Sequence, residues 1–125
     1  MGTMTRSVAG VLCAVALALP AHAADLTPAA HKEIAQLLER IETSNCSFNR
    51  NGSWYGAQDA RKHLQRKLDY MVERKMLASA EEFIAHAGTA SSMSGKPYLI
   101  RCGAGESTPS ADWLRAELRR MRAPS

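Results

Sequence analysis

The sequence predicts an α+β fold, with about four helices packed around a short two-stranded antiparallel ribbon that one disulfide staples. Three observations predict it. Four segments repeat their apolar residues every three or four positions, which is the period of an amphipathic helix. Two short segments have the pattern of strands. Two cysteines, Cys46 and Cys102, stand at the ends of those strand segments.

The first 23 residues have the features of a cleavable signal peptide. Arg6 is positively charged, residues 8–19 are almost entirely Ala, Val and Leu, and Pro20 precedes the small-x-small pattern Ala21-His22-Ala23. A membrane anchor is the alternative, but a spanning helix needs about 20 apolar residues. We therefore expect cleavage after Ala23, a periplasmic location and no membrane span in the mature chain.

Cleavage leaves residues 24–125, a common length for a single globular domain and too short for two. Cys13 leaves with the signal, so Cys46 and Cys102 are the remaining pair for an intramolecular disulfide in an oxidising compartment. Two free buried thiols are the alternative. Neither cysteine has another cysteine or histidine at ligand spacing. We therefore expect no metal site. We also expect no cofactor and a monomeric protein.

The first helix is predicted to start at Thr27-Pro28, because threonine can cap backbone amides and proline needs no N–H there. One apolar stripe follows, made of Ile34, Leu37, Leu38 and Ile41. The helix is then expected to end at Ser44-Asn45. Residues 46–50 alternate in polarity and predict a short strand. Asn51-Gly52 indicates a turn directly after it.

A second helix is expected from near Gly56 to about Arg74. A third opens at Ser79-Ala80-Glu81-Glu82, which is a capping box. It ends near Gly88, before a run of small polar residues. Residues 97–102 have the strongest strand pattern in the chain, and Thr108-Pro109 indicates the start of a last helix.

The disulfide predicts how the two strands pair. If they run antiparallel with Cys46 opposite Cys102, then Ser47 faces Arg101 and Phe48 faces Ile100. Two apolar residues then lie opposite each other, as cross-strand packing favours. The same register brings residues 50–53 beside residues 91–96, which are two polar loops far apart in the sequence.

The charge of the chain is modestly basic, with a formal net charge of +4. Much of the excess lies between Arg61 and Lys75, in the second predicted helix. A basic helix can bind nucleic acid or a membrane surface. An exported protein rarely meets nucleic acid, however, and this helix lacks a bulky apolar face. We interpret it as a solvated helix face and expect no nucleic-acid partner.

Several short motifs in the same regions resemble those of the YfeK-like family of uncharacterised proteobacterial exported proteins. They occur in the same order and at similar spacing: Phe48-Asn49-Arg50-Asn51-Gly52, Ala60, His63-Leu64, Lys67-Leu68, Glu82-Phe83-Ile84, Ser91-Ser92 and Ser94-Gly95-Lys96-Pro97-Tyr98. The likeness covers nearly all of the mature chain. Asn49 departs from the pattern, because an apolar strand residue is usual there. The resemblance implies a domain of unknown function and supplies no catalytic role.

One hypothesis for these residues is a small hydrolase. Asp59, His63 and Lys67 recur every four residues and share one helical stripe. With Asp59 as its orienter, His63 could act as a base on a loop serine such as Ser92. The chain has no G-x-S-x-G elbow for a strained nucleophile. The simpler alternative for His63 is a hydrogen bond to a neighbouring loop.

The favoured hypothesis is a non-catalytic periplasmic binding or accessory protein with a donor-rich surface for an anionic or carbonyl-rich partner. The candidate binding residues are Arg50, Asn51, Ser53, His63, Lys67, Ser92, Ser94, Lys96 and Tyr98. An envelope protein, a peptide or a cell-wall fragment would fit such a surface. The alternatives are that these residues merely tie the two loops together, or that the protein is an inhibitor or immunity-type protein.

Overall fold

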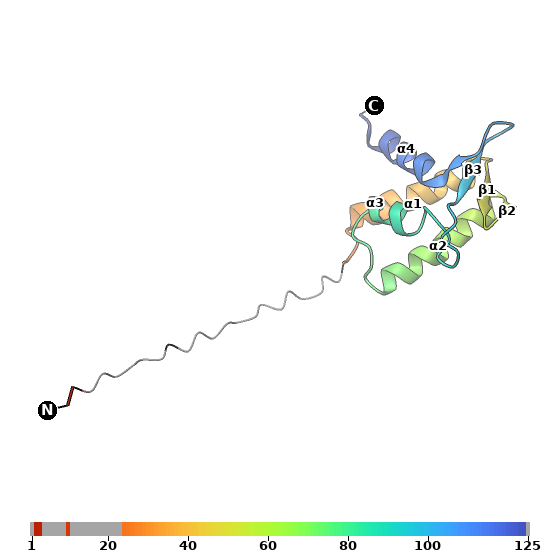
Figure 1. The fold of residues 1–125 in the computed structure, drawn as a ribbon. Coiled ribbons are helices and arrows are strands. Elements are labelled where there is room, and N and C mark those ends of the chain that lie inside the picture. The colour runs from red at the N-terminus through yellow and green to blue at the C-terminus, as the bar shows by residue number, and fades with distance from the viewer. Residues whose placement is uncertain (1, 4–9, 11–23, 125) are drawn as a thin grey trace.

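The computed structural model describes residues 2, 3, 10 and 24–124. Apart from residues 2, 3 and 10, the predicted signal peptide lies outside the described residues. Figure 1 shows four helices beside a small sheet, with the strands at the end of the molecule where α2 begins. No helix among the described residues is long and apolar enough to cross a membrane.

Helix α1 (Pro28–Thr43) is capped as its sequence predicts, because the Thr27 hydroxyl accepts a hydrogen bond from the Ala30 amide at 3.1 Å. Its apolar stripe is almost fully buried, which confirms the predicted inner face: Ile34, Leu37, Leu38 and Ile41. Helix α1 packs most extensively against helix α2 (Ala57–Glu73). The inner face of α2 adds Leu64, Leu68 and Met71 to the same core.

Helix α3 (Ala80–His86) starts at the predicted capping box, where the Ser79 hydroxyl accepts from the Glu82 amide at 3.1 Å. The Glu82 carboxylate accepts from the Ala78 amide at 2.6 Å, one residue before the position that the motif predicts. Helix α4 (Ser110–Arg122) closes the fold. Arg122 of α4 binds Glu33 of α1 and Glu81 of α3, so one guanidinium ties three helices together.

The sheet has four strands, so the predicted two-stranded ribbon is wrong in number. The order is β2-β1-β3-β4, all antiparallel; the strands are β1 (Ser47–Arg50), β2 (Ser53–Tyr55), β3 (Leu99–Arg101) and β4 (Thr108–Pro109). Asn51 and Gly52 have φ values of +53° and +86°, which is the backbone that a two-residue hairpin needs. That turn folds β2 back onto β1. The two added strands are three and two residues long, too short for a readable polarity pattern.

The central strand pair has the predicted register, with Ser47 opposite Arg101 and Phe48 opposite Ile100. Cys46 and Cys102 form the predicted disulfide just outside that pairing. Phe48 and Ile100 are both buried, so the predicted apolar pair lies in the core. The α+β class and the staple are therefore confirmed.

Gly88 lies just after α3 and close to Leu114 of α4. A Cβ atom at Gly88 would lie 2.7 Å from Leu114 Cδ1 and 3.3 Å from the Ile84 carbonyl oxygen. Both distances are shorter than ordinary van der Waals contact, so a side chain at this position would require at least the Leu114 side chain to move.

Removal of the disulfide is expected to destabilise the fold. The bond joins residues that are 56 positions apart, and loop-closure entropy gives up to about 4 kcal/mol for a loop of that length. A variant with both Cys46→Ala and Cys102→Ala should lose roughly 2–4 kcal/mol in free energy of unfolding, measured by urea denaturation. The wild type under reducing conditions should lose a similar amount. A loss below about 0.5 kcal/mol in both samples would contradict the expected role.

Candidate functional site

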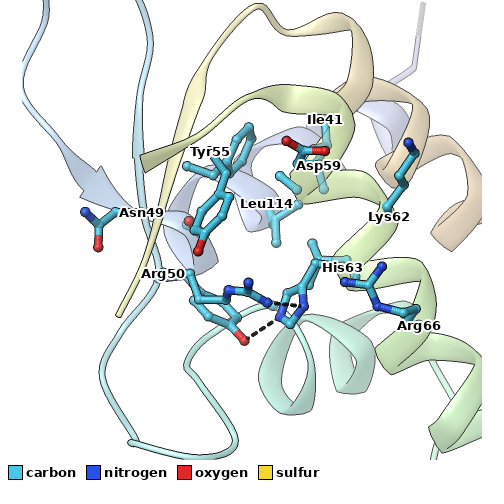
Figure 2. Close-up of a pocket in the computed structure, with 15 residues that line it drawn as sticks. Ile41, Asn49, Arg50, Tyr55, Asp59, Lys62, His63, Arg66 and Leu114 are labelled. Carbon is cyan, nitrogen blue, oxygen red and sulfur yellow. Dashed lines mark hydrogen bonds between the residues drawn. The ribbon is translucent and has the colours of Figure 1, made fainter. Parts of the chain in front are cut away.

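A cavity of about 260 Å³ lies among the sheet, α1, α2 and the start of α4. We call it the β1–α2 pocket, after the elements that supply most of its lining. One part of the lining is apolar and buried: Ile41, Phe48, Ala60, Leu64 and Leu114. The other part is polar and more exposed, and so forms the mouth: Asn49, Arg50, Tyr55, Asp59, Lys62, His63 and Arg66. Figure 2 shows the Arg50 and His63 side chains directed toward each other across this mouth.

A chain of hydrogen bonds links four of the candidate residues beside the pocket. Arg50 Nη1 lies 2.6 Å from His63 Nδ1, and His63 Nε2 lies 3.0 Å from the Tyr98 hydroxyl. Lys67 Nζ donates to the same hydroxyl at 3.1 Å and to the Ala90 carbonyl at 3.1 Å. Strand β1, helix α2 and the segment before β3 therefore meet at one polar cluster.

The chemistry of Arg50 assigns the tautomer of His63. A guanidinium can only donate, so His63 Nδ1 must accept and Nε2 must carry the proton. Nε2–H then donates to the Tyr98 hydroxyl oxygen, which also accepts from Lys67. Both ring nitrogens of His63 are thus occupied.

Burial and neighbouring cations keep His63 neutral. Burial first, and then the charges of Arg50, Lys67 and Arg66, lower the pKa of His63 from 6.5 to about 4. Burial and the Arg50 charge also lower the pKa of Lys67. Burial raises the pKa of Tyr98, so its phenol stays protonated at neutral pH. The cluster is therefore cationic and rich in donors, and it contains no carboxylate.

Arg50 also lies over Tyr55, with its guanidinium carbon 4.8 Å from the ring centroid. The guanidinium beside Tyr55 lowers the pKa of the phenol. Tyr55 on one side and His63 on the other hold the Arg50 head group at the mouth of the pocket. Tyr55 was not among the predicted site residues, and the signal that could have found it is its place three residues after the predicted Asn51-Gly52 turn, beside the candidate residues Arg50 and Ser53.

The two polar loops meet as the predicted register requires. Asn51 Nδ2 donates to Ser91 Oγ at 3.3 Å, and Ser94 Oγ donates to Asn51 Oδ1. Ser91 is buried, and its hydroxyl also accepts from the amides of Met93 and Ser94, both at 3.3 Å. Ser91 is therefore the centre of this loop contact, although it was not among the predicted binding residues.

The predicted site residues thus fall into three groups. Arg50, His63, Lys67 and Tyr98 form the cluster beside the pocket. Asn51 and Ser94 join the loops to each other. The remaining three are exposed at the surface: Ser53, Ser92 and Lys96.

The hydrolase geometry considered above is not formed among the described residues. Nδ1 of His63, which a carboxylate would have to orient, is bound by Arg50 instead. Figure 2 shows the Asp59 carboxylate well apart from the His63 ring. Within residues 24–124, no group of three or more His, Cys, Asp or Glu side chains is placed to hold a metal ion.

Two buried residues of the pocket lining, Tyr98 and Ser110, carry a hydroxyl, and only that of Tyr98 is hydrogen-bonded among the described residues. The exposure of Ser110 is 3%, and its Oγ has no hydrogen-bond partner among the described residues. A buried hydroxyl without a partner costs about 1–3 kcal/mol. The backbone amide of Ser110 is satisfied by the Tyr98 carbonyl at 2.9 Å, so the deficit belongs to the side chain alone.

Fold and site together define a small disulfide-bonded α+β domain with a cationic mouth over an apolar pocket. Residues 28–122 match the model of a family of unknown function (DUF5329), and the chain belongs to that family. It is 35% identical over 94 residues to the uncharacterized protein YfeK of Salmonella typhimurium, a match that covers 70% of this chain and 74% of YfeK. No solved structure matches the chain. The family resemblance inferred from the motifs is confirmed.

The lowered pKa of His63 predicts a pH dependence of stability. The unfolded state titrates near pH 6.5 and the folded state near 4, so the unfolded state binds more protons between these values. Stability should therefore fall as the pH drops from 6.5 toward 4. The full shift corresponds to about 3 kcal/mol, and we expect about 1–2 kcal/mol because the ring is partly exposed and screened.

The measurement is urea unfolding at neutral pH and near pH 4.5, for the wild type and for His63→Gln. Glutamine can accept from Arg50 and donate to Tyr98, but it does not titrate. The variant should lose less stability over this interval than the wild type. Equal losses in the two proteins would show that His63 does not titrate as its surroundings require.

Proposed function

We propose that this protein is a non-catalytic binding protein whose β1–α2 pocket takes a small ligand by an anionic or carbonyl-bearing group. The observation that carries the proposal is the combination of an apolar pocket with a cationic mouth. Arg50, Lys62 and Arg66 line the pocket against a single carboxylate, that of Asp59. Apolar pockets with a few convergent polar groups are the usual form of small-molecule sites.

Arg50 is the group best suited to hold the ligand. Its planar fork can bind a carboxylate through two parallel hydrogen bonds. Contacts on both sides, from Tyr55 and His63, orient the fork before a ligand arrives. Such preorganisation reduces the entropy lost on binding. A free peptide terminus or an acidic cell-wall fragment would supply the required anion.

The state of His63 supports binding over hydrolysis. A general base needs a free nitrogen and a pKa near the working pH. Here Arg50 and Tyr98 occupy both nitrogens, and the pKa of His63 is about 4. The ring is suited instead to orienting Arg50 without adding a charge of its own.

The binding proposal predicts that a simple carboxylate binds in a manner that depends on Arg50. Octanoate, which joins a carboxylate to an apolar chain, is a suitable probe for isothermal titration calorimetry. Arg50→Gln should weaken its binding by at least tenfold, because the charged fork is lost. Arg50→Lys should have an intermediate effect, because it keeps the charge and loses the fork.

Arg119→Gln is the matched control, because Arg119 is exposed on α4 and does not line the pocket. It removes the same charge and should leave octanoate binding unchanged. Circular dichroism should show that all variants remain folded. The proposal fails if octanoate does not bind, or if Arg50→Gln and Arg119→Gln have the same effect on binding.

We also propose that the protein works in the periplasm, after cleavage of its leader. The disulfide supports this proposal, because disulfides persist in oxidising compartments. The Ala24 amide donates to the Lys75 carbonyl at 2.9 Å. This bond, next to the end of α2, would hold the new amino terminus against the domain.

Export can be tested by cell fractionation and amino-terminal sequencing of the protein from its native host. The protein should be recovered in the periplasmic fraction, with Ala24 as its first residue. Recovery in the cytoplasm, or an intact leader on the folded protein, would contradict the export proposal.

A further inference from the structure

We infer that the β1–α2 pocket selects a phosphate monoester in its dianionic form, carried on a single apolar chain, over carboxylates and other monoanions. The inference rests on the proposed function and names the chemical class of its ligand. It starts from the charges around the mouth, because the cations there form no ion pair with a carboxylate among the described residues.

Three cations lie around the neutral ring of His63. Arg50 Nη1 is 2.6 Å from its Nδ1, and Lys67 donates to the Tyr98 hydroxyl that also accepts from its Nε2. Figure 2 shows the Arg50 and Arg66 guanidinium groups on either side of the ring, and the Arg66 charge helps to lower the pKa of His63. Arg50, Lys67 and Arg66 therefore act on the same small region.

Carboxylates near α2 do not neutralise these cations. Glu42 of α1 pairs with Arg61, and Asp69 accepts a hydrogen bond from within α2. Asp59 lines the pocket, but Figure 2 shows its carboxylate well apart from the His63 ring. The region around the ring therefore keeps a surplus of positive charge.

The same cluster has hydrogen-bond donors to spare. The Tyr98 oxygen accepts from His63 and from Lys67, so its own proton is left to donate, and no acceptor for it lies among the described residues. Arg50 uses Nη1 on His63 and keeps further N–H groups for a ligand. A dianionic phosphate presents only acceptor oxygens, and it has more of them than a carboxylate. It therefore suits a site with this surplus of donors.

The positive charge also favours a dianion over a monoanion. Coulomb energy scales with the product of the charges, so each nearby cation attracts a dianion about twice as strongly as a monoanion. A phosphate monoester carries about −1.5 to −2 charges at neutral pH. A carboxylate or a sulfate ester carries a single charge. Several cations without a counter-charge therefore favour the phosphate.

The inner part of the pocket requires an apolar chain on the phosphate. An ionised group beside Phe48 and Leu114 would be costly, because an apolar wall cannot replace its water. The phosphate therefore stays at the mouth. At roughly 30 Å³ for each water-sized group, a cavity of about 260 Å³ holds on the order of nine non-hydrogen atoms. The ligand class is thus phosphate monoesters with one chain of medium length.

The test compares octyl phosphate with octyl sulfate, which has the same chain, by calorimetric titration at about pH 8 and about pH 5. The second pKa of a phosphate monoester is about 6, so octyl phosphate is a dianion at the higher pH and mainly a monoanion at the lower. Octyl sulfate is a monoanion at both. The wild type should bind octyl phosphate about tenfold more tightly than octyl sulfate at about pH 8, and at most about twofold more tightly at about pH 5.

Octyl sulfate also controls for titration of the protein, because a change in the charge of the site acts on both ligands. The pKa of His63 is about 4, so its ring stays mainly neutral at both pH values. The charged and titratable groups around the mouth are Arg50 of β1, Tyr55 of β2, Tyr98 before β3 and, on α2, Asp59, Lys62, His63, Arg66 and Lys67.

Arg66→Gln and Lys62→Gln form a matched pair of variants. Both residues are exposed on α2 and line the pocket, but Figure 2 shows the Lys62 ammonium directed away from the His63 ring. Arg66→Gln should reduce the preference for octyl phosphate at about pH 8 by at least about twofold, because a cation beside the ring is lost. Lys62→Gln removes an equal charge and should reduce the preference less. Circular dichroism should show that both variants remain folded.

Inorganic phosphate separates recognition of the phosphate from use of the apolar pocket. It should bind the wild type at least about tenfold more weakly than octyl phosphate, because it leaves the apolar lining in contact with water. Equal affinities would overturn the assignment of a chain-bearing ligand.

The inference is also overturned if octyl phosphate has no advantage over octyl sulfate at about pH 8, or if that advantage is unchanged at about pH 5. Equal effects of Arg66→Gln and Lys62→Gln would contradict it as well. In each of these cases, Arg50-dependent binding of octanoate would leave the proposed function standing. If no anion binds in an Arg50-dependent manner, the proposed function fails, and this inference fails with it.

Discussion

The pairing of β1 with β3 is the constraint on which the rest of the structure depends. It places Phe48 opposite Ile100, and both side chains enter the core. Because β1 ends at Arg50 and Tyr98 directly precedes β3, the same register brings both residues to α2. A slip of one residue would turn Phe48 to the other face of the sheet. The disulfide just outside this pairing opposes such a slip, so one bond protects both the core and the site.

The polar cluster combines positive charge with burial, and its protonation states reconcile the two. Burial and the neighbouring cations favour the neutral form of His63, whose pKa is lowered to about 4, and they lower the pKa of Lys67 as well. A neutral ring is a good acceptor for Arg50 and still donates to Tyr98. An anion at the mouth would offset the surplus of cations. The positive charge of the cluster is therefore complementary to the anionic group that we propose for its ligand.

Sequence reasoning was most successful where one residue type dictates local geometry. Thr27 and Ser79 marked helix starts, because their hydroxyls replace missing backbone partners. The cysteines predicted the strand register, because a disulfide permits few relative positions. The same register predicted that residues 50–53 would lie beside residues 91–96, and Asn51 and Ser94 are hydrogen-bonded there. The strand β2 was missed because three residues carry no period, although the turn before it was recognised.

The pocket could not be predicted, because no local pattern distinguishes a residue that fills the core from one that borders a cavity. Leu64 and Leu114 are core residues by pattern and by burial, and both also line the pocket. Ser110 gives no signal either, since a serine at the start of a helix usually serves as a cap. A cavity and an unpaired hydroxyl both lower stability. A small domain with little stability to spare would retain both more readily if a ligand compensated for them.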